Sequence, residues 1–377
     1  MPTADANRNR VIFQSDFLYT GPSPATGKHY TFGTGSQDIV GSGTTNLISG
    51  LYRIQDISYG FNIARTDVNQ FGELAAIDRI ILEQPTVNIQ FSYLQANLYN
   101  EKTMGFTITS GATPISAFAS ILDKTKDEKN YFIRRSAEGL DAITVNPASG
   151  NFVYAVGNGF ISSFSTEGSV GNFARTTIGI DALNMEFEEN VSGNNIPAVN
   201  PVDGTAITAN KYELPTALSS PVHLSGVSAL RPGDITVSIG NNEGGVNIDD
   251  MKIQSYNITY DIARDPLQKL GSKYAFSREI RYPSNATATV TADIGSSQSG
   301  SLIQMITDNK DYTVEVKVNH PSLASTVVCD YKLLGAKLDS HAYTSSIGAN
   351  NSVTLTFTTQ IGASGQTTKG VFLSGWN

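Results

Sequence analysis

The stretch ISYGFNIARTDVNQFGELAAIDRIILEQPTVNIQF, residues 57–91, decides the fold of this chain, because a degenerate copy of it, YNITYDIARDPLQKLGSKYAFSREIRYPSNATATV, occupies residues 256–290. The Ile-Ala-Arg triplet that ends at Arg65 aligns with the triplet that ends at Arg264. Without a gap, further identities follow at Gly72 and Gly271, Ala76 and Ala275, Arg79 and Arg278, and Ile81 and Ile280. With one inserted residue, Pro85 then falls on Pro283. An internal repeat defines the structural unit, so the sequence predicts two related units in tandem.

Each copy predicts two β-strands that flank a long loop. Residues 57–63 and 87–93 alternate between apolar and small polar side chains, and residues 256–262 and 286–291 do the same in the second copy. A period of two is typical of a strand with one buried face. The loop over residues 65–85 is too long for a tight hairpin turn.

The segments around the two copies extend the parallel. A short helix is predicted at residues 115–122 and again at 301–307, each followed by further strands. Residues 222–231 resemble residues 11–20 as a first strand, and Lys310-Asp311-Tyr312 matches Lys129-Asn130-Tyr131. The sequence therefore predicts a mainly β chain with two tandem β-barrel or β-sandwich domains, each with a short helix and a long inter-strand loop. The expected division is an N-terminal arm with a strand and loop (1–50), a first unit (48–188), a linker rich in Asn, Gly and Pro (189–221), a second unit (222–362) and a C-terminal tail (363–377).

Composition narrows the class of function. Only 16% of the 377 residues are charged, which is low for a soluble enzyme and suits a protein whose surface is largely covered by copies of itself. The net charge of −8 argues against a nucleic-acid binder that works through a basic surface. No apolar run approaches the ~20 residues of a membrane span, and the N-terminus lacks the apolar region of a signal peptide. We therefore expect neither membrane insertion nor secretion by a signal peptide.

Reactive groups are few and scattered. The single cysteine, Cys329, excludes an intrachain disulfide and is expected to be buried in a strand. The four histidines show no spacing that would hold a metal, and no nucleophile elbow, phosphate-binding loop or dinucleotide fingerprint is present. The carboxylates of residues 186–189 fit a solvated strand end better than a cation site. We expect no catalytic activity, no cofactor and no metal.

The polar faces of the repeated strands carry most of the remaining information. An ordinary solvent-facing sheet usually carries Lys and Glu, whereas these faces carry Ser, Gly, Asn, Gln and Thr, with Asp261 as their one charge. Two interpretations remain open: an exposed sheet that is rich in Thr, or the lining of a channel. The candidate lining residues are Ser58, Asn62, Asn88, Gln90, Asn257, Thr259, Asp261, Thr287 and Thr289.

With its two strands, its Ile-Ala-Arg triplet and the spaced Gly, Arg and Pro that follow, each copy resembles the bacteriophage tail tube (major tail) protein family. In that family the pattern is a β-hairpin whose long loop grips the neighbouring subunit. The resemblance implies that role for Arg65, Asp67, Gly72, Arg79 and Pro85, and again for Arg264, Pro266, Gly271, Arg278 and Pro283. The first copy departs from the second in having Asp67 where the second has Pro266, so we expect its loop to differ in shape.

The resemblance also implies a function. Each unit would add strands to a closed inner barrel, and rings of subunits would stack into the tail tube, a channel for genome ejection. The chain would then be a structural, homo-oligomeric virion protein of the viral tail, assembled in the host cytoplasm. Its partners would be further copies of itself, the tape measure protein and tail completion or baseplate proteins, while DNA would pass without sequence-specific binding.

The size of a duplex distinguishes two ring geometries. Six units that each give four strands, ~4.8 Å apart and tilted ~40°, make a wall roughly 48 Å across and about 38 Å inside its side chains. Twelve units would give about 95 Å, far more than one duplex needs. We therefore expect a trimer with pseudo-sixfold symmetry, with a hexamer whose second units are displaced outward as the alternative. Two other functions remain open: a tail terminator or baseplate hub ring of the same fold, and a non-catalytic carbohydrate-binding or adhesive β-sandwich.

Overall fold

The structure is a computed structural model, and it confirms that the chain is mainly β, with two short α-helices among the described residues. The described residues are 16–22, 48–110, 113–122, 127–136, 141–143, 152–189, 194–200, 204–207, 211–212, 214–215, 229–240, 251–271, 274–275, 277–294, 310–321, 326–347 and 350–375.

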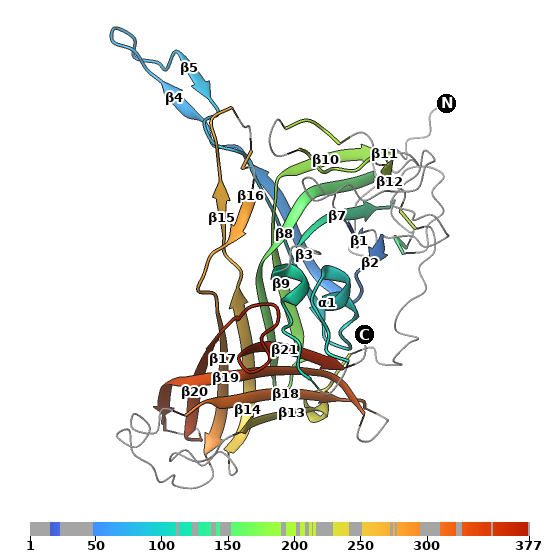
Figure 1. The fold of residues 1–377 in the computed structure, drawn as a ribbon, viewed down its shortest axis with the longest axis vertical. Helices are drawn as coiled ribbons and strands as arrows, with labels where there is room; N and C mark the ends of the chain where they lie inside the picture. The colour runs from blue at the N-terminus through green and yellow to red at the C-terminus, as the bar shows by residue number, and fades with distance from the viewer. Residues whose placement is uncertain are drawn as a thin grey trace.

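One long antiparallel sheet runs through both units (Figure 1). Its eight strands, in spatial order, are β3 (Ile54–Asn62), β6 (Thr86–Leu94), β9 (Arg175–Ala182), β8 (Phe152–Ser169), β14 (Met251–Asp261), β17 (Asn285–Ile294), β20 (Ser352–Gln360) and β19 (Val327–Thr344). The first four strands come from the first unit and the last four from the second. The units are joined where β14 pairs with β8.

The strands β8 and β19, each 18 residues long, leave this sheet and enter a second layer of strands. In the first unit that layer is formed by β1 (Asp16–Pro22), β2 (Ser49–Gly50), β7 (Glu128–Arg135) and β10 (Asn184–Glu189), and in the second by β13 (Ile235–Gly240), β18 (Tyr312–Asn319) and β21 (Gly370–Gly375). Each unit is thus a curved sandwich whose longest strand belongs to both layers.

The two units repeat each other strand by strand. The pairings β3–β6, β6–β9, β8–β9, β7–β8, β8–β10 and β1–β7 recur as β14–β17, β17–β20, β19–β20, β18–β19, β19–β21 and β13–β18. Even the irregularities recur, because the β-bulge between Ile54 and Asp56 returns between Ile253 and Ser255. A bulge inserts an unpaired residue at a defined place, so its recurrence fixes the alignment of the two units.

Strand pairing corrects three details of the sequence alignment. Phe61 lies opposite Val87 and Tyr260 opposite Ala286, which leaves no room for an inserted residue, so Pro283 does not correspond to Pro85. A proline fixes its own φ but not the register, which the hydrogen-bond ladder sets.

The second correction concerns the Lys-x-Tyr match. Tyr131 lies opposite Val156, whereas Tyr312 lies opposite Ala336, three residues beyond Leu333, the counterpart of Val156. The two tyrosines are therefore not equivalent.

The third correction concerns the first strand of the second unit. The counterpart of β1 is β13, which follows Pro232-Gly233, so the strand expected at residues 222–231 is misplaced. Residues 222–228 lie outside the described part, and residues 229–231 are not a strand. The expected arm and tail also hold strands of the sandwiches, since β1 pairs with β7 and β21 with β19.

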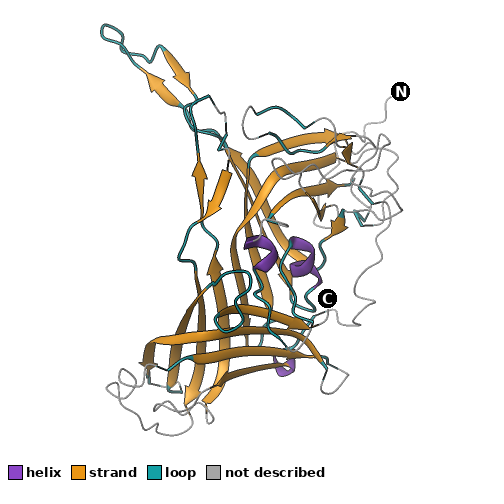
Figure 2. Ribbon diagram, viewed as in Figure 1, coloured by secondary structure: helices purple, strands orange, loops and turns teal. Residues whose placement is uncertain are grey.

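The helices are shorter than the sequence predicted. Of the candidate at residues 115–122, only α2 (Ala119–Leu122) is helical, and the candidate at 301–307 lies outside the described residues. The helix α1 (Tyr99–Met104) was not predicted, because its six residues are too few to show a helical period. In Figure 2 both helices lie between the two groups of strands that cross the long sheet.

One hydrophobic core runs from unit to unit across the β8–β14 junction. Phe164 on β8 stacks on Tyr260 of β14, with ring centroids 4.3 Å apart, and Phe106 packs against both rings. Aromatic pairs of this kind stabilise by roughly 0.5–1.5 kcal/mol beyond the area they bury. The two units therefore share a core instead of meeting through a solvated linker.

Part of the segment expected as a linker also packs as core. Within residues 189–221, β11 (Asn194–Asn195) pairs with β12 (Lys211–Tyr212), and Ile196 is buried with Phe132 in a second cluster. The approach is so close at Gly157 that a Cβ atom there would lie 2.2 Å from the carbonyl oxygen of Pro197. The composition of a loop did not reveal this packing.

Candidate functional site: a polar sheet face and two projecting ribbons

All the candidate lining residues lie on one face of the long sheet. Opposite residues in a ladder share a face, so the register can be followed across strands. One such row is Ser58, Gln90, Gly179, Ser163 and Asp261, and a second is Thr177, Ser165, Thr259, Thr287 and Thr358. The buried face carries the alternate residues, including Ile89, Phe91 and Tyr260. The alternation read from the sequence is therefore correct, and one polar surface spans the eight strands.

Exposure differs along this polar face. Six of the candidates are exposed and three are half-buried; the exposed ones are Ser58, Asn62, Asn88, Gln90, Thr259 and Asp261, and the half-buried ones are Asn257, Thr287 and Thr289. Two open hollows lie on this face beside the β8–β14 junction, one reached by Asn257 and Thr289 and the other by Gln90 and Thr259. The face is thus concave where the two units meet.

Two strands that lie between the repeated pairs, β9 and β8, add carboxylates to the face. Asp181 on β9 lies opposite Asn88, and Glu167 on β8 lies opposite Asn257. Burial raises the pKa of Asp181, and the nearby positive charge of Arg278 opposes that rise. Arg175 lies opposite Glu167, but its guanidinium is 3.2 Å from the carboxylate of Asp56. The face is mainly uncharged, with carboxylates as most of its charged groups.

The long loops of both units are two-stranded ribbons that project from the sheet (Figure 1). The first is β4 (Thr66–Val68) with β5 (Asp78–Ile80), and the second is β15 (Arg264–Leu267) with β16 (Ser277–Ile280). Gly72 and Gly271 lie at equivalent places past the first strand of each ribbon, with φ of 94° and 86°. Only glycine adopts such angles without strain, which explains why both copies carry it.

The first ribbon exposes a set of large apolar side chains. Phe71 and Leu74 at its tip are fully exposed, at 108% and 111% of their reference areas. Other apolar residues along it are also exposed: Val68, Ile77, Ile80, Ile81 and Leu82. Several large apolar side chains exposed on one projecting element are typical of an interaction surface.

The second ribbon rests on the first unit through its arginines. The side chain of Arg264 is 7% exposed, lies 4.7 Å over the ring of Phe160 and is 3.6 Å from Asp127. Arg278 approaches the same ring, with its guanidinium carbon 5.8 Å from the centroid. Burial lowers the pKa of both arginines. Pro266 and Gly271 are exposed, as is Pro283 beyond the ribbon.

Among the described residues, the equivalent arginines of the first ribbon do not pack against a neighbouring unit in this way. Arg65 is exposed, and Arg79 donates to Asp67 across the ribbon at 2.6 Å. Asp67 occupies the position of Pro266, so the departure noticed in the sequence supplies an ion pair within the ribbon. Pro85 is half-buried at the start of β6. Of the ten predicted loop residues, the structure thus packs Arg264 and Arg278 against the first unit, leaves Pro85 half-buried and leaves the other seven exposed.

A buried carboxylate lies at the seam between the units. Glu101 on α1 is fully buried, and the hydroxyl of Tyr331 from β19 donates to its Oε1 at 3.0 Å. Burial raises the pKa of Glu101 to about 7. A protonated carboxyl is uncharged, so it costs less to bury in this core than a carboxylate does. We therefore assign Glu101 to the seam between the units and not to the polar face.

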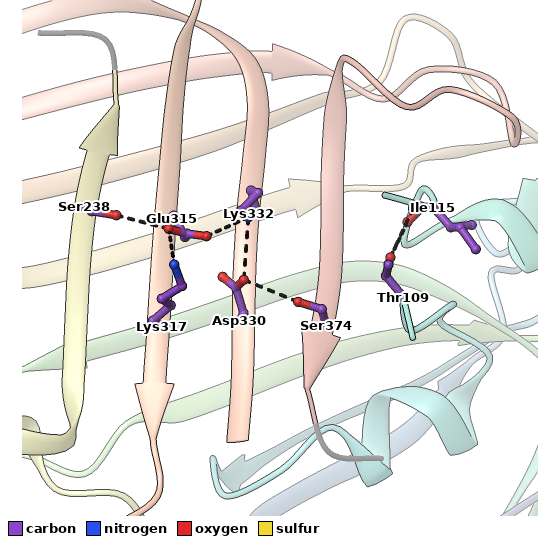
Figure 3. A network of polar contacts seen from close by, with 8 residues as sticks. All are labelled: Thr109, Ile115, Ser238, Glu315, Lys317, Asp330, Lys332 and Ser374. Atoms are coloured by element: carbon purple, nitrogen blue, oxygen red, sulfur yellow. Dashed lines mark hydrogen bonds and ion pairs between the residues drawn. The ribbon is translucent and has the colours of Figure 1, made fainter. Parts of the chain in front are cut away.

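A charge network ties the second layer of the second unit together (Figure 3). Glu315 on β18 accepts from Lys317 at 2.7 Å and from Lys332 at 2.6 Å, and Lys332 is 3.8 Å from Asp330. Burial and the neighbouring Glu315 raise the pKa of Asp330 to about 6. Ser238 and Ser374 extend the network to β13 and β21. It links four strands and contains no nucleophile paired with a base.

Other features of the described residues add no reactive centre. Cys329 is buried in β19, as predicted, and burial raises the pKa of its thiol. Among the described residues, no group of three or more His, Cys, Asp or Glu side chains is placed to hold a metal ion. The helices in the described ranges are too short or too polar to cross a membrane. Neither a scan against protein-family models nor a search of curated proteins gave a match to the chain.

Proposed function

We propose that the chain is a structural subunit of a bacteriophage tail tube, whose copies form stacked rings around a channel for genome delivery. One observation carries the proposal: a single eight-stranded sheet, four strands from each unit, presents a continuous and mainly uncharged polar face that is concave at the unit junction. Such a face suits the inner wall of a barrel better than an ordinary exposed sheet.

The chemistry of the face supports passage of DNA over retention. Ser, Thr, Asn and Gln offer hydrogen bonds to water but no strong ionic hold on a phosphate. Carboxylates such as Asp181 and Asp261 repel the backbone of a duplex, and the chain carries a net charge of −8. DNA would therefore pass through the lumen without being held by its phosphates.

The number of strands supports a ring of three chains. Four strands per unit is the number that makes a wall of six units roughly 48 Å across. Three chains supply six such units, so a trimer with pseudo-sixfold symmetry encloses one duplex. The exposed ribbons would contact neighbouring subunits or rings, and the tape measure and the tail completion or baseplate proteins would be the other partners within the virion.

Negative-stain electron microscopy of the purified chain tests the proposal. We expect hollow cylinders built of stacked rings, with top views that show six lobes. Single rings that do not stack would favour a tail terminator or baseplate hub protein, and solitary particles at all concentrations would contradict both. A glycan array that bound the solitary particle would favour a carbohydrate-binding sandwich.

A further inference from the structure

Two strands of the long sheet have a free side within the described residues. The strand β3 pairs only with β6. The outer half of β19, residues 337–344, pairs only with β20, because β18 and β21 bind its inner half. Unpaired edges of this length promote association with other strands.

The chain itself shows what fits against such an edge. In the first unit, the outer half of β8 is the counterpart of residues 337–344, and it pairs on its other side with β14, the counterpart of β3. Backbone bonds hold both ends of this ladder: the amide of Ile262 donates to Ser162 at 2.8 Å and that of Val170 to Gln254 at 2.9 Å. The β8–β14 joint therefore shows how the outer half of β8 in the first unit pairs with a strand of the second unit.

Burial shows that no described residue of the chain fills the equivalent place in the second unit. Phe164 and Thr166 on β8 are fully buried, while Tyr343, the counterpart of Thr166, is 58% exposed. Likewise Tyr260 on β14 is 2% exposed, while its counterpart Phe61 on β3 is 55% exposed. Both halves of a second joint are present, on opposite ends of the sheet.

We propose that β3 of one copy pairs antiparallel with the outer half of β19 of the next copy, in the register of the β8–β14 joint. Transferring that register places Ser58 opposite Thr344, Gly60 opposite Ala342 and Asn62 opposite Ser340. Phe61 then lies against His341, as Tyr260 lies against Phe164. The joint deepens the proposed tail tube function, because it makes the contact head-to-tail and closes the sheet into a ring.

Side-chain volumes agree with this register. At the internal joint, Tyr256 lies over Gly168, where a Cβ atom would approach its ring to 2.5 Å. At the proposed joint the counterparts are Ile57 and Ser345, so a smaller side chain meets a residue that already has a Cβ. The polar face also continues without interruption, since the six paired residues on that side are small or uncharged.

Disulfide trapping tests the register. The hydrogen-bonded pairs of the β8–β14 ladder include Ile262 with Ser162, so Asn257 with Glu167 is a non-hydrogen-bonded pair. Such pairs have Cα atoms about 4.5 Å apart, which suits a disulfide. Its counterpart is Ser58 with Thr344, on the solvent side of the joint. The variant Ser58→Cys, Thr344→Cys is oxidised mildly at a concentration that gives assemblies, then run on a denaturing gel without reductant.

We expect a ladder of covalent multimers that ends at the number of chains in the ring, which is three for the proposed trimer. The matched control Ser58→Cys, Ser340→Cys keeps the same two strands but is four residues out of register, and it should stay mainly monomeric. Either single variant should also stay monomeric. A dimer of the Ser58→Cys single variant would mean that β3 pairs with β3, and would overturn the proposal.

Microscopy of the same samples separates this inference from the proposed function. Cylinders without cross-linking at Ser58 and Thr344 would overturn the joint and leave the tube. Cross-linking with no ring or cylinder would support the joint and overturn the tube. A ladder from the control that equals that of the matched pair would show contact without register, and would also overturn the joint.

Discussion

The strands β3 and β14 carry the same alternating pattern, but they lie in different surroundings. On β14, Tyr260 is enclosed between β8 and β17, whereas on β3 the equivalent Phe61 is exposed. The difference does not come from the strands, which share even their β-bulge. It comes from the neighbour, because only the second unit has another unit of the same chain to rest on.

The two ribbons repeat this contrast. Arg264 is buried against Phe160 and Asp127, while the equivalent Arg65 is exposed. By strand register, the counterparts of Phe160 and Asp127 in the second unit are Lys337 and Lys310. These two lysines would repel the positive charge of an arginine at that position. The contact of a ribbon arginine with Phe160 and Asp127 is therefore specific to the junction inside the chain.

The largest expected effect separates the enclosed strand from the open one. The substitution Tyr260→Ala should lower the free energy of unfolding by about 4 kcal/mol, because it leaves a cavity beside Phe164. The matched substitution Phe61→Ala should change it by less than about 1 kcal/mol in the dilute chain. Urea unfolding midpoints measure both. Similar losses for the two variants would mean that β3 is enclosed in the free chain, contrary to its exposure.

A pH series tests the seam that closes the internal junction. Tyr331, Tyr93 and Arg53 face the carboxyl of Glu101, whose pKa rises from 4.5 in the unfolded chain to about 7. The folded state then holds a proton that the unfolded state has released, so stability is full below pH 4.5 and falls as pH rises toward 7. The loss amounts to about 3 kcal/mol above pH 7.

The variant Glu101→Gln should remove this part of the pH dependence, measured as unfolding midpoints between pH 4.5 and 8. The control Glu167→Gln changes an exposed carboxylate on the polar face and should leave the slope as it is. An unchanged slope in Glu101→Gln would show that the seam carboxyl does not titrate in this range.

The smallest effect concerns the two ribbons. The substitution Arg264→Ala should cost about 2 kcal/mol, because it removes the contact with Phe160 and leaves Asp127 without its ion pair. The substitution Arg65→Ala should stay within about 0.5 kcal/mol. Thermal unfolding of both variants under one buffer compares them. If Arg65→Ala were equally costly in the dilute chain, the first ribbon would have a seat that its exposure does not indicate.

Much of the fold followed from patterns that depend on local chemistry. Alternation at 57–63 and 256–262 predicted strands and their buried faces, because side chains in a strand point to opposite sides in turn. The same alternation placed Asn88, Gln90 and Thr287 on the polar faces of their strands, where the strand register also puts them. The helix α1 was missed because six residues carry too little helical periodicity, and the strand β13 was missed because the first strand of the second unit was expected at residues 222–231.

The sequence by itself determined that the chain is a β-rich tandem repeat with one polar and one apolar face on its main strands. The repeat follows from the recurrence of the same residues, and the two faces follow from the alternation of polar and apolar residues. Only the tertiary structure decided that eight strands form one sheet, that β8 pairs with β14, and that the arginines of one ribbon pack against the first unit while those of the other are exposed. Those outcomes depend on which surfaces meet across distant parts of the chain, and two copies of one pattern meet different neighbours.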